Sequence, residues 1–251
     1  MNGERMEGKS KRSETPSGAS RLQRWFYCFV TIVVYLWGLA YHRLERRGRI
    51  PRNLEGPLVF VSNHASNLDP VLIGASIPDM LHFLAKKELF AIPVLGWLVR
   101  SLNSIPLDRR GIDRAALRTA VGALRQGGKL LLFPEGTRSK DGSLGRARAG
   151  AGMIAAMGKA RIAPVYIEGT REAMPVGASW IRPRKVRIVF GDPVDLPARP
   201  EGVSNKEYYQ RCAEEMMERI AQVRDSAASR PAWRPGADLQ SPPGTPEDVK
   251  K

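Results

Sequence analysis

Residues 58–76 read LVFVSNHASNLDPVLIGAS: an apolar run, a polar loop and a second apolar segment. The run at residues 58–62 is short and continuous, which predicts a strand buried on both faces. Pro70 suits the first turn of a helix, so residues 70–76 predict a short helix directly after the loop. A buried strand followed by a helix is the unit from which α/β domains are built.

The pattern recurs along the chain. Apolar runs predict further strands at residues 81–84, 129–133, 162–167 and 186–190. Helical spacing predicts helices at residues 113–125, 150–157 and 208–223, with Asp113 as the N-cap of the first. Strands that alternate with helices predict an α/β domain with a mostly parallel central sheet flanked by helices.

The amino-acid composition and net charge limit the classes of function that this protein can have. The chain has 251 residues, 43% of them hydrophobic, and a formal net charge of +15. Two cysteines exclude a disulfide scaffold and a cysteine-rich zinc site, and three histidines leave little material for a metal centre. We therefore expect no metal and no cofactor. The positive charge indicates an anionic partner, namely nucleic acid, a membrane surface or a phosphorylated substrate.

Residues 25–41 form an uncharged apolar run with aromatic side chains near both ends and arginines on both flanks. As a helix the run measures roughly 25 Å, slightly short of a hydrocarbon core of about 30 Å. The sequence favours an N-terminal membrane-associated helix that spans the bilayer or lies shallowly in it. A cleaved signal peptide and a buried core helix are the alternatives.

His64 and Asp69 lie in the loop between the first predicted strand and its helix. Ligands of open α/β sheets bind at the carboxyl ends of the strands, where this loop lies. A carboxylate that accepts from imidazole Nδ1–H fixes the tautomer and leaves Nε2 as a base. The pair can therefore deprotonate a substrate hydroxyl. The alternative interpretation of Asp69 is a helix N-cap followed by proline.

Three other segments follow predicted strands or flank them. In residues 131–139, LLFPEGTRS, Gly136 allows a close backbone approach, Thr137 offers a hydroxyl and Arg138 can grip a phosphate. In residues 104–110, SIPLDRR, Arg109 is either a surface charge or a second phosphate contact. Residues 162–165, IAPV, read as a strand edge that shapes the pocket.

These four segments occur in the order of four family motifs, and residues 55–195 resemble the 1-acylglycerol-3-phosphate acyltransferase (PlsC-like) family. The resemblance implies that His64 is the catalytic base and that Asp69 orients it. It also implies that Arg109, Glu135, Gly136, Thr137 and Arg138 bind the glycerol-phosphate part of the substrate.

The resemblance further implies a reaction and its partners. The donor would be a fatty acyl thioester on CoA or acyl carrier protein, the acceptor lysophosphatidic acid and the product phosphatidic acid. Anionic membrane lipids are expected partners and nucleic acid is not. Cytosolic donors imply that the catalytic domain faces the cytoplasm, at the inner membrane.

Ser104, Pro106 and Leu107 depart from the second motif, which leaves the acceptor open. Glycerol 3-phosphate, a lysophospholipid or an ornithine lipid are alternatives, and a non-catalytic basic module that binds membrane or nucleic acid is the alternative from another class. The predicted organisation is a disordered tail at residues 1–20, a membrane-anchoring helix at 21–50, an acyltransferase domain at 51–224 and a flexible Pro-rich tail at 225–251.

Overall fold

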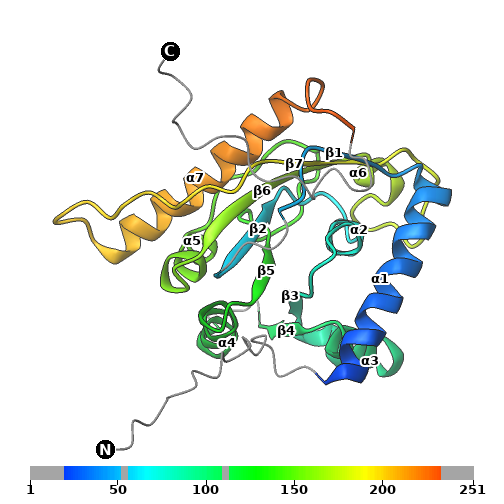
Figure 1. Ribbon diagram of the computed structural model, residues 1–251, viewed down its shortest axis with the longest axis horizontal. Coiled ribbons are helices and arrows are strands. Elements are labelled where there is room, and N and C mark those ends of the chain that lie inside the picture. The colour runs from blue at the N-terminus through cyan, green and yellow to red at the C-terminus, as the bar shows by residue number, and fades with distance from the viewer. Residues whose placement is uncertain (1–19, 52–55, 109–112, 233–251) are drawn as a thin grey trace, which may run out of the picture.

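Seven strands form one sheet within residues 20–51, 56–108 and 113–232, the parts of the chain that the computed structural model describes. Their order across the sheet is β1-β7-β6-β2-β5-β3-β4 (Figure 1). The strands are β1 (Glu45–Arg47), β2 (Leu58–Ser62), β3 (Leu81–Lys86), β4 (Ser104–Leu107), β5 (Lys129–Leu132), β6 (Arg161–Glu168) and β7 (Arg187–Phe190).

The strands from β2 to β6 run parallel to one another, which confirms the predicted mostly parallel sheet. Strand β7 is the exception, because it pairs with β6 in the antiparallel sense, and β1 runs parallel to β7. An antiparallel pair needs no crossover helix. The connection from β6 to β7 accordingly contains only the short helix α6 (Thr170–Ala173) and a loop.

Helices cover both faces of the sheet. Figure 1 shows α1 and α2 on one side and α4, α5 and α7 on the other. The remaining elements are α1 (Arg21–His42), α2 (Asp69–Ser76), the 3₁₀ helix η1 (Lys87–Ala91), α3 (Pro93–Ser101), α4 (Arg114–Arg125), α5 (Ala149–Met157) and α7 (Asn205–Asp225). Helix α4 begins as predicted, since the Asp113 carboxylate accepts from the backbone N–H groups of Ala115 and Ala116.

Strand β2 lies in the middle of the sheet and is buried throughout. Successive side chains of a strand point to opposite faces. Leu58 and Phe60 accordingly belong to the core beside α2, whereas Val59 and Val61 belong to the core beside α4, α5 and α7. Burial on two faces explains why this strand reads as a continuous apolar run.

Helix α1 is docked on the domain along one face only. At its N-terminal end the Tyr27 hydroxyl accepts a hydrogen bond from Leu81 N (3.1 Å), and at its C-terminal end Gly38 lies against Leu72. The alternative of a buried core helix therefore applies to one side of α1 only, because 17% of the most apolar 18-residue stretch of this helix is buried. Among the described helices, α1 is the one long and apolar enough to cross a membrane.

The structure adds two strands to those that the sequence predicts. The added strands, β1 and β4, lie at the two edges of the sheet. Edge strands tolerate charged residues and proline, so the sequences of β1 and β4 lack the apolar pattern that predicts a strand. Residues 162–167, predicted to be a strand, lie within the interior strand β6, which is hydrogen-bonded between β7 and β2. The described beginning of the predicted C-terminal tail lies against the sheet, where Ala232 bridges to Arg47.

Candidate active site

His64 lies in the loop after β2, at the carboxyl edge of the parallel strands. Its Nδ1 is 2.8 Å from Oδ2 of Asp69. Because an ionised carboxylate oxygen can only accept, Nδ1 is the donor in this contact, and in the neutral ring Nε2 keeps its lone pair. The Asp69 side chain is fully buried and that of His64 is 10% exposed. The carboxylate is therefore shielded from water, whereas the imidazole is in contact with solvent.

Asp69 is the first residue of α2, not its N-cap. Leu68 holds the cap position, and the Asp69 carboxylate turns back toward the loop. Oδ2 accepts from the backbone N–H groups of Ala65 (2.7 Å) and Ser66 (2.8 Å) as well as from His64. These donors explain why a buried carboxylate is tolerated here and why it stays in one orientation. The N-cap interpretation of Asp69 is therefore wrong.

Glu135 lies directly behind the His64 loop and is buried. Its Oε1 accepts from the backbone N–H of His64 (2.9 Å) and its Oε2 from that of Gly145 (3.1 Å). Burial raises the pKa of the Glu135 carboxyl above its ordinary value, although both backbone hydrogen bonds act in the opposite direction. Both oxygens are engaged by backbone donors, so this side chain connects the β2 loop to the β5 loop.

Two further contacts hold His64 in place, and the sequence did not indicate them. The ring of Phe133 is stacked on that of His64, with centroids 4.1 Å apart and an interplanar angle of 22°. The backbone carbonyl of His64 accepts from Ser139 N (2.7 Å). Phe133 stands at the end of an apolar run, and nothing in that run distinguishes a ring that faces a catalytic loop from a core side chain.

Asn63, which the sequence analysis also passed over, anchors the same loop to β6. Its Nδ2 donates to the carbonyl of Ile167 and its Oδ1 accepts from the N–H of Ile167, both at 2.9 Å. The side chain thus continues the pairing of β2 with β6 beyond the last strand residue. A loop held in this way presents His64 with little conformational freedom.

The turn after β5 brings the predicted phosphate-binding residues close to the loop. Gly136 has a φ of +67°, which favours glycine, and a Cβ there would lie 2.9 Å from Cδ of Arg148. Thr137 is exposed and Arg138 half-buried, directly before the Ser139 that bonds to His64. Arg138 makes no ion pair within the described residues. Arg109 lies outside the described residues.

Within the described ranges, no group of three or more His, Cys, Asp or Glu side chains gathers in a way that could hold a metal ion. The His64–Asp69 pair places an imidazole that can act as a base at this site. A base of this kind can accept a proton from a hydroxyl through Nε2, because Nδ1 is engaged by Asp69.

Three comparisons with known proteins agree. The Acyltransferase family profile matches residues 40–168, just over half of the chain. The chain is 35% identical over 143 residues to the chloroplastic 1-acyl-sn-glycerol-3-phosphate acyltransferase of Arabidopsis thaliana, covering 55% of this chain and 39% of that protein. It is 31% identical over 181 residues to the 1-acyl-sn-glycerol-3-phosphate acyltransferase of Streptococcus pneumoniae, covering 69% and 64%.

The match to a solved structure is more extensive. The crystal structure of the 1-acyl-sn-glycerophosphate acyltransferase PlsC from Thermotoga maritima superimposes with a TM-score of 0.64 at 30% identity, covering 82% of this chain and 80% of that one. The chain spans less than two thirds of the length of these two curated relatives. The family profile, together with the parallel sheet and the His64–Asp69 pair, shows that the chain belongs to the acyltransferase family.

Proposed function

We propose that this protein transfers a fatty acyl group from a thioester, carried by CoA or acyl carrier protein, to the free hydroxyl of 1-acylglycerol-3-phosphate, yielding phosphatidic acid. The observation that carries the proposal is the 2.8 Å contact between His64 Nδ1 and the buried Asp69 carboxylate. Membership of the acyltransferase family and the activities for which the similar proteins are named support the same reaction.

The acceptor hydroxyl gives its proton to Nε2 of His64 as its oxygen bonds to the thioester carbonyl carbon. The resulting tetrahedral intermediate collapses, the carbon–sulfur bond breaks, and the leaving thiolate takes the proton back from the imidazolium. Asp69 stabilises the imidazolium between these two transfers. General-base assistance of this kind contributes roughly 10²–10⁴-fold to the rate.

Arg138 and Thr137 bind the acceptor phosphate in this proposal. Their support is position, since the N–H of the next residue, Ser139, is bonded to the His64 carbonyl. A phosphate held there keeps the nearby hydroxyl beside Nε2, which lowers the entropic cost of attack. Glu135 and Phe133 act as positioning residues, because both contact the His64 loop and Glu135 has no free oxygen for a ligand. Arg109 remains a substrate-binding residue by resemblance alone.

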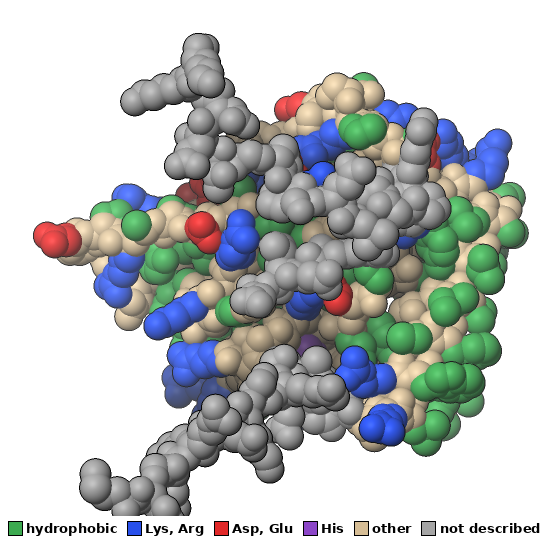
Figure 2. Space-filling model, viewed as in Figure 1, with side chains coloured by type: hydrophobic (Ala, Val, Ile, Leu, Met, Phe, Trp, Pro, Cys, Tyr) green, Lys and Arg blue, Asp and Glu red, His purple; other side chains and the backbone are tan. Residues whose placement is uncertain are grey.

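Helix α1 associates with the inner membrane in this proposal. Its outward face carries large apolar side chains along its whole length, and they gather at one edge of the molecule in Figure 2. These side chains are Leu22, Trp25, Phe29, Ile32, Val33, Leu36 and Leu39. Because the other face of α1 is docked on the domain at both ends, a position in the plane of the interface fits better than a full span. Cytosolic donors then reach the domain from the cytoplasmic side.

The experiment that tests the reaction measures thiol release from acyl-CoA by the purified protein in lipid vesicles, with mass spectrometry of the lipid product. The acceptor panel contains lysophosphatidic acid, glycerol 3-phosphate, a lysophospholipid and an ornithine lipid precursor. We expect phosphatidic acid from lysophosphatidic acid as the main product. Preferential acylation of another member of the panel would reassign the acceptor, and no thiol release with any acceptor would contradict the proposal.

His64→Ala should lower kcat by about 10²-fold or more, because the base is removed. Asp69→Asn should also lower kcat, and the double variant should be no slower than His64→Ala, since the two side chains act as a unit. The matched control is His82→Gln, which alters a histidine in β3. Near-wild-type turnover by folded His64→Ala would disprove the mechanism.

A further inference from the structure

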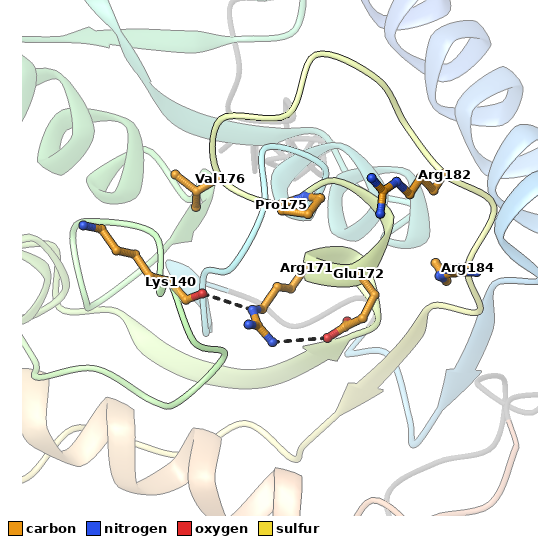
Figure 3. A pocket seen from close by; sticks show the side chains of 7 residues that line it. All are labelled: Lys140, Arg171, Glu172, Pro175, Val176, Arg182 and Arg184. Carbon is orange, nitrogen blue, oxygen red and sulfur yellow. Dashed lines mark hydrogen bonds and ion pairs between the residues drawn. The ribbon is translucent and has the colours of Figure 1, made fainter.

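A cavity of about 510 Å³ opens beside the active-site loop and carries an excess of positive charge. Four of its lining side chains are basic, Lys140, Arg171, Arg182 and Arg184, and one is acidic, Glu172. Figure 3 shows the basic side chains coming from two separate loops and from α6. Sequence alone does not reveal the cluster, because Lys140 and Arg184 are far apart along the chain.

Little inside the described chain neutralises these cations. The Arg171 guanidinium donates to the backbone carbonyl of Lys140 (3.1 Å) and lies 3.5 Å from a carboxylate oxygen of Glu172. Within the described residues, Lys140, Arg182 and Arg184 make no ion pair. Cations of like sign around one hollow repel each other, so their gathering is favourable when an anion binds there.

The cavity is connected to the His64 loop on two sides. Lys140 follows Ser139, whose N–H donates to the His64 carbonyl, and Pro175 follows Met174, whose carbonyl accepts from the Ser66 hydroxyl (2.8 Å). A ligand seated in the cavity therefore lies next to the loop that carries the proposed base.

The dimensions and composition of the cavity favour a large, multiply charged ligand. Its volume lies within the range of roughly 300–1,000 Å³ that takes whole small molecules, so it exceeds the needs of a single phosphate. Arginine side chains bind phosphate groups bidentately. Trp180 is exposed next to the cavity, with the Arg182 guanidinium 5.8 Å from its ring centroid, and such a ring can stack a nucleobase.

We propose that this cavity binds the phosphorylated nucleotide end of a CoA thioester, the acyl donor. The proposal rests on the proposed function and deepens it by choosing the donor. The diphosphate and ribose phosphate of CoA contact Arg171, Arg182, Arg184 and Lys140, and the adenine stacks near Trp180. The flexible arm then carries the thioester to His64, while the acceptor phosphate occupies the separate Thr137–Arg138 turn.

The first experiment measures binding without turnover. Calorimetric titrations compare CoA, adenosine 3′,5′-bisphosphate and pantetheine, which lacks the nucleotide, against the full-length protein. The test variant is Arg182→Gln/Arg184→Gln, and the control is Arg118→Gln/Arg211→Gln, which removes two exposed charges on α4 and α7. We expect the Kd for CoA to rise at least about ten-fold in the test variant only. Equal CoA affinities in both variants, or pantetheine binding as tightly as CoA, would overturn the proposal.

The second experiment measures steady-state kinetics with the same variants. We expect the KM for acyl-CoA to rise about ten-fold or more in Arg182→Gln/Arg184→Gln, while the KM for lysophosphatidic acid stays within about two-fold. A rise in the acceptor KM alone would instead assign the cavity to the acceptor phosphate. Weaker binding to anionic vesicles with both KM values unchanged would assign it to lipid headgroups. An effect confined to acyl carrier protein as donor would assign it to that protein. Each of these three results refutes the proposal.

The two experiments separate this proposal from the proposed function. CoA binding that depends on Arg182 and Arg184 in a protein without acyl transfer would support the cavity and refute the reaction. Acyl transfer by a protein whose CoA affinity does not depend on Arg182 and Arg184 would support the reaction and refute the cavity.

Discussion

At the residue scale, His64 is held by contacts from three residues. Asp69 binds its Nδ1, Phe133 stacks on its ring, and the backbone N–H of Ser139 fixes its carbonyl. A side chain with so many fixed neighbours loses little further entropy when the substrate binds. The spacing of His64 and Asp69 was readable in the sequence because a short loop can fold back on itself. The contact between Phe133 and His64 could not be predicted, because it joins the loops that follow two different strands of the sheet.

The pH dependence of stability should reveal the buried carboxyl of Glu135. Burial raises the pKa of this carboxyl above its ordinary value of 4.5. At any pH between the ordinary pKa and the raised pKa, the folded protein therefore keeps a proton that the unfolded chain has lost. The contribution of this group therefore falls as the pH rises through that interval, by up to about 1.4 kcal/mol per pH unit, and is constant above it.

Glu135→Gln removes this titration, and its amide places an N–H group against the Gly145 N–H, at a cost of about 1–3 kcal/mol. Urea unfolding from pH 4.5 to 7.5 should show that the stability advantage of the wild type over the variant shrinks as the pH rises. Glu218→Gln, an exposed carboxyl on α7, controls for the change in charge. An advantage that grows with pH would contradict this account of Glu135.

At the scale of elements, the central strands were predictable and the edge strands were not. Strands β2, β5 and β6 are buried, and the apolar runs in their sequences predict them. Strand β1 consists of Glu45, Arg46 and Arg47, so no hydrophobic pattern marks it; its pairing with β7 makes it a strand. Edge strands need only one neighbour and tolerate charge, which is why pattern alone misses them.

The packing of α5 on α7 depends on Gly152. A Cβ at this position would lie 2.0 Å from the carbonyl oxygen of Tyr209 and 2.8 Å from the backbone nitrogen of Ala213. Because both are backbone atoms, they cannot swing aside, and the helices must separate. Gly152→Ala should therefore lower the free energy of unfolding by roughly 2–3 kcal/mol despite the better helix propensity of alanine.

Gly150, two residues earlier in α5, is the matched control, since a Cβ there meets nothing within 4 Å. Gly150→Ala should leave stability unchanged or raise it by up to about 1 kcal/mol. Thermal and urea unfolding of both variants would check the pair. Equal stabilities would contradict the close approach of the two helices.

At the scale of the whole molecule, α1 gives the protein one apolar side. Its outward face continues toward α3, because Phe26 contacts the exposed Trp97 with ring centroids 5.0 Å apart. A contiguous exposed apolar surface of this kind is typical of a protein that meets a membrane. The basic cavity lies by the other end of α1, where the Tyr41 hydroxyl donates to the Ile181 carbonyl (3.0 Å).

Phe29→Ser/Leu36→Ser should weaken association with lipid vesicles, because both side chains are more than half exposed on the outward face of α1. Each buried apolar side chain contributes roughly 1.5–3 kcal/mol, so the partition coefficient should fall at least about ten-fold. Vesicle flotation measures this, with Met157→Ser as a control at an exposed apolar position on α5, on the other side of the sheet. Unchanged flotation of Phe29→Ser/Leu36→Ser would show that α1 does not contact the membrane.

The sequence by itself determined the order of buried strands and helices, the apolar character of α1 and the pairing of His64 with Asp69, since each of these is encoded in neighbouring residues. Only the tertiary structure decided that Glu135 supports the His64 loop, that the Phe133 ring stacks on the imidazole, and that four basic side chains share one cavity. These arrangements join segments that are distant along the chain, so they follow from strand order and register, which local patterns of hydrophobicity and charge do not encode.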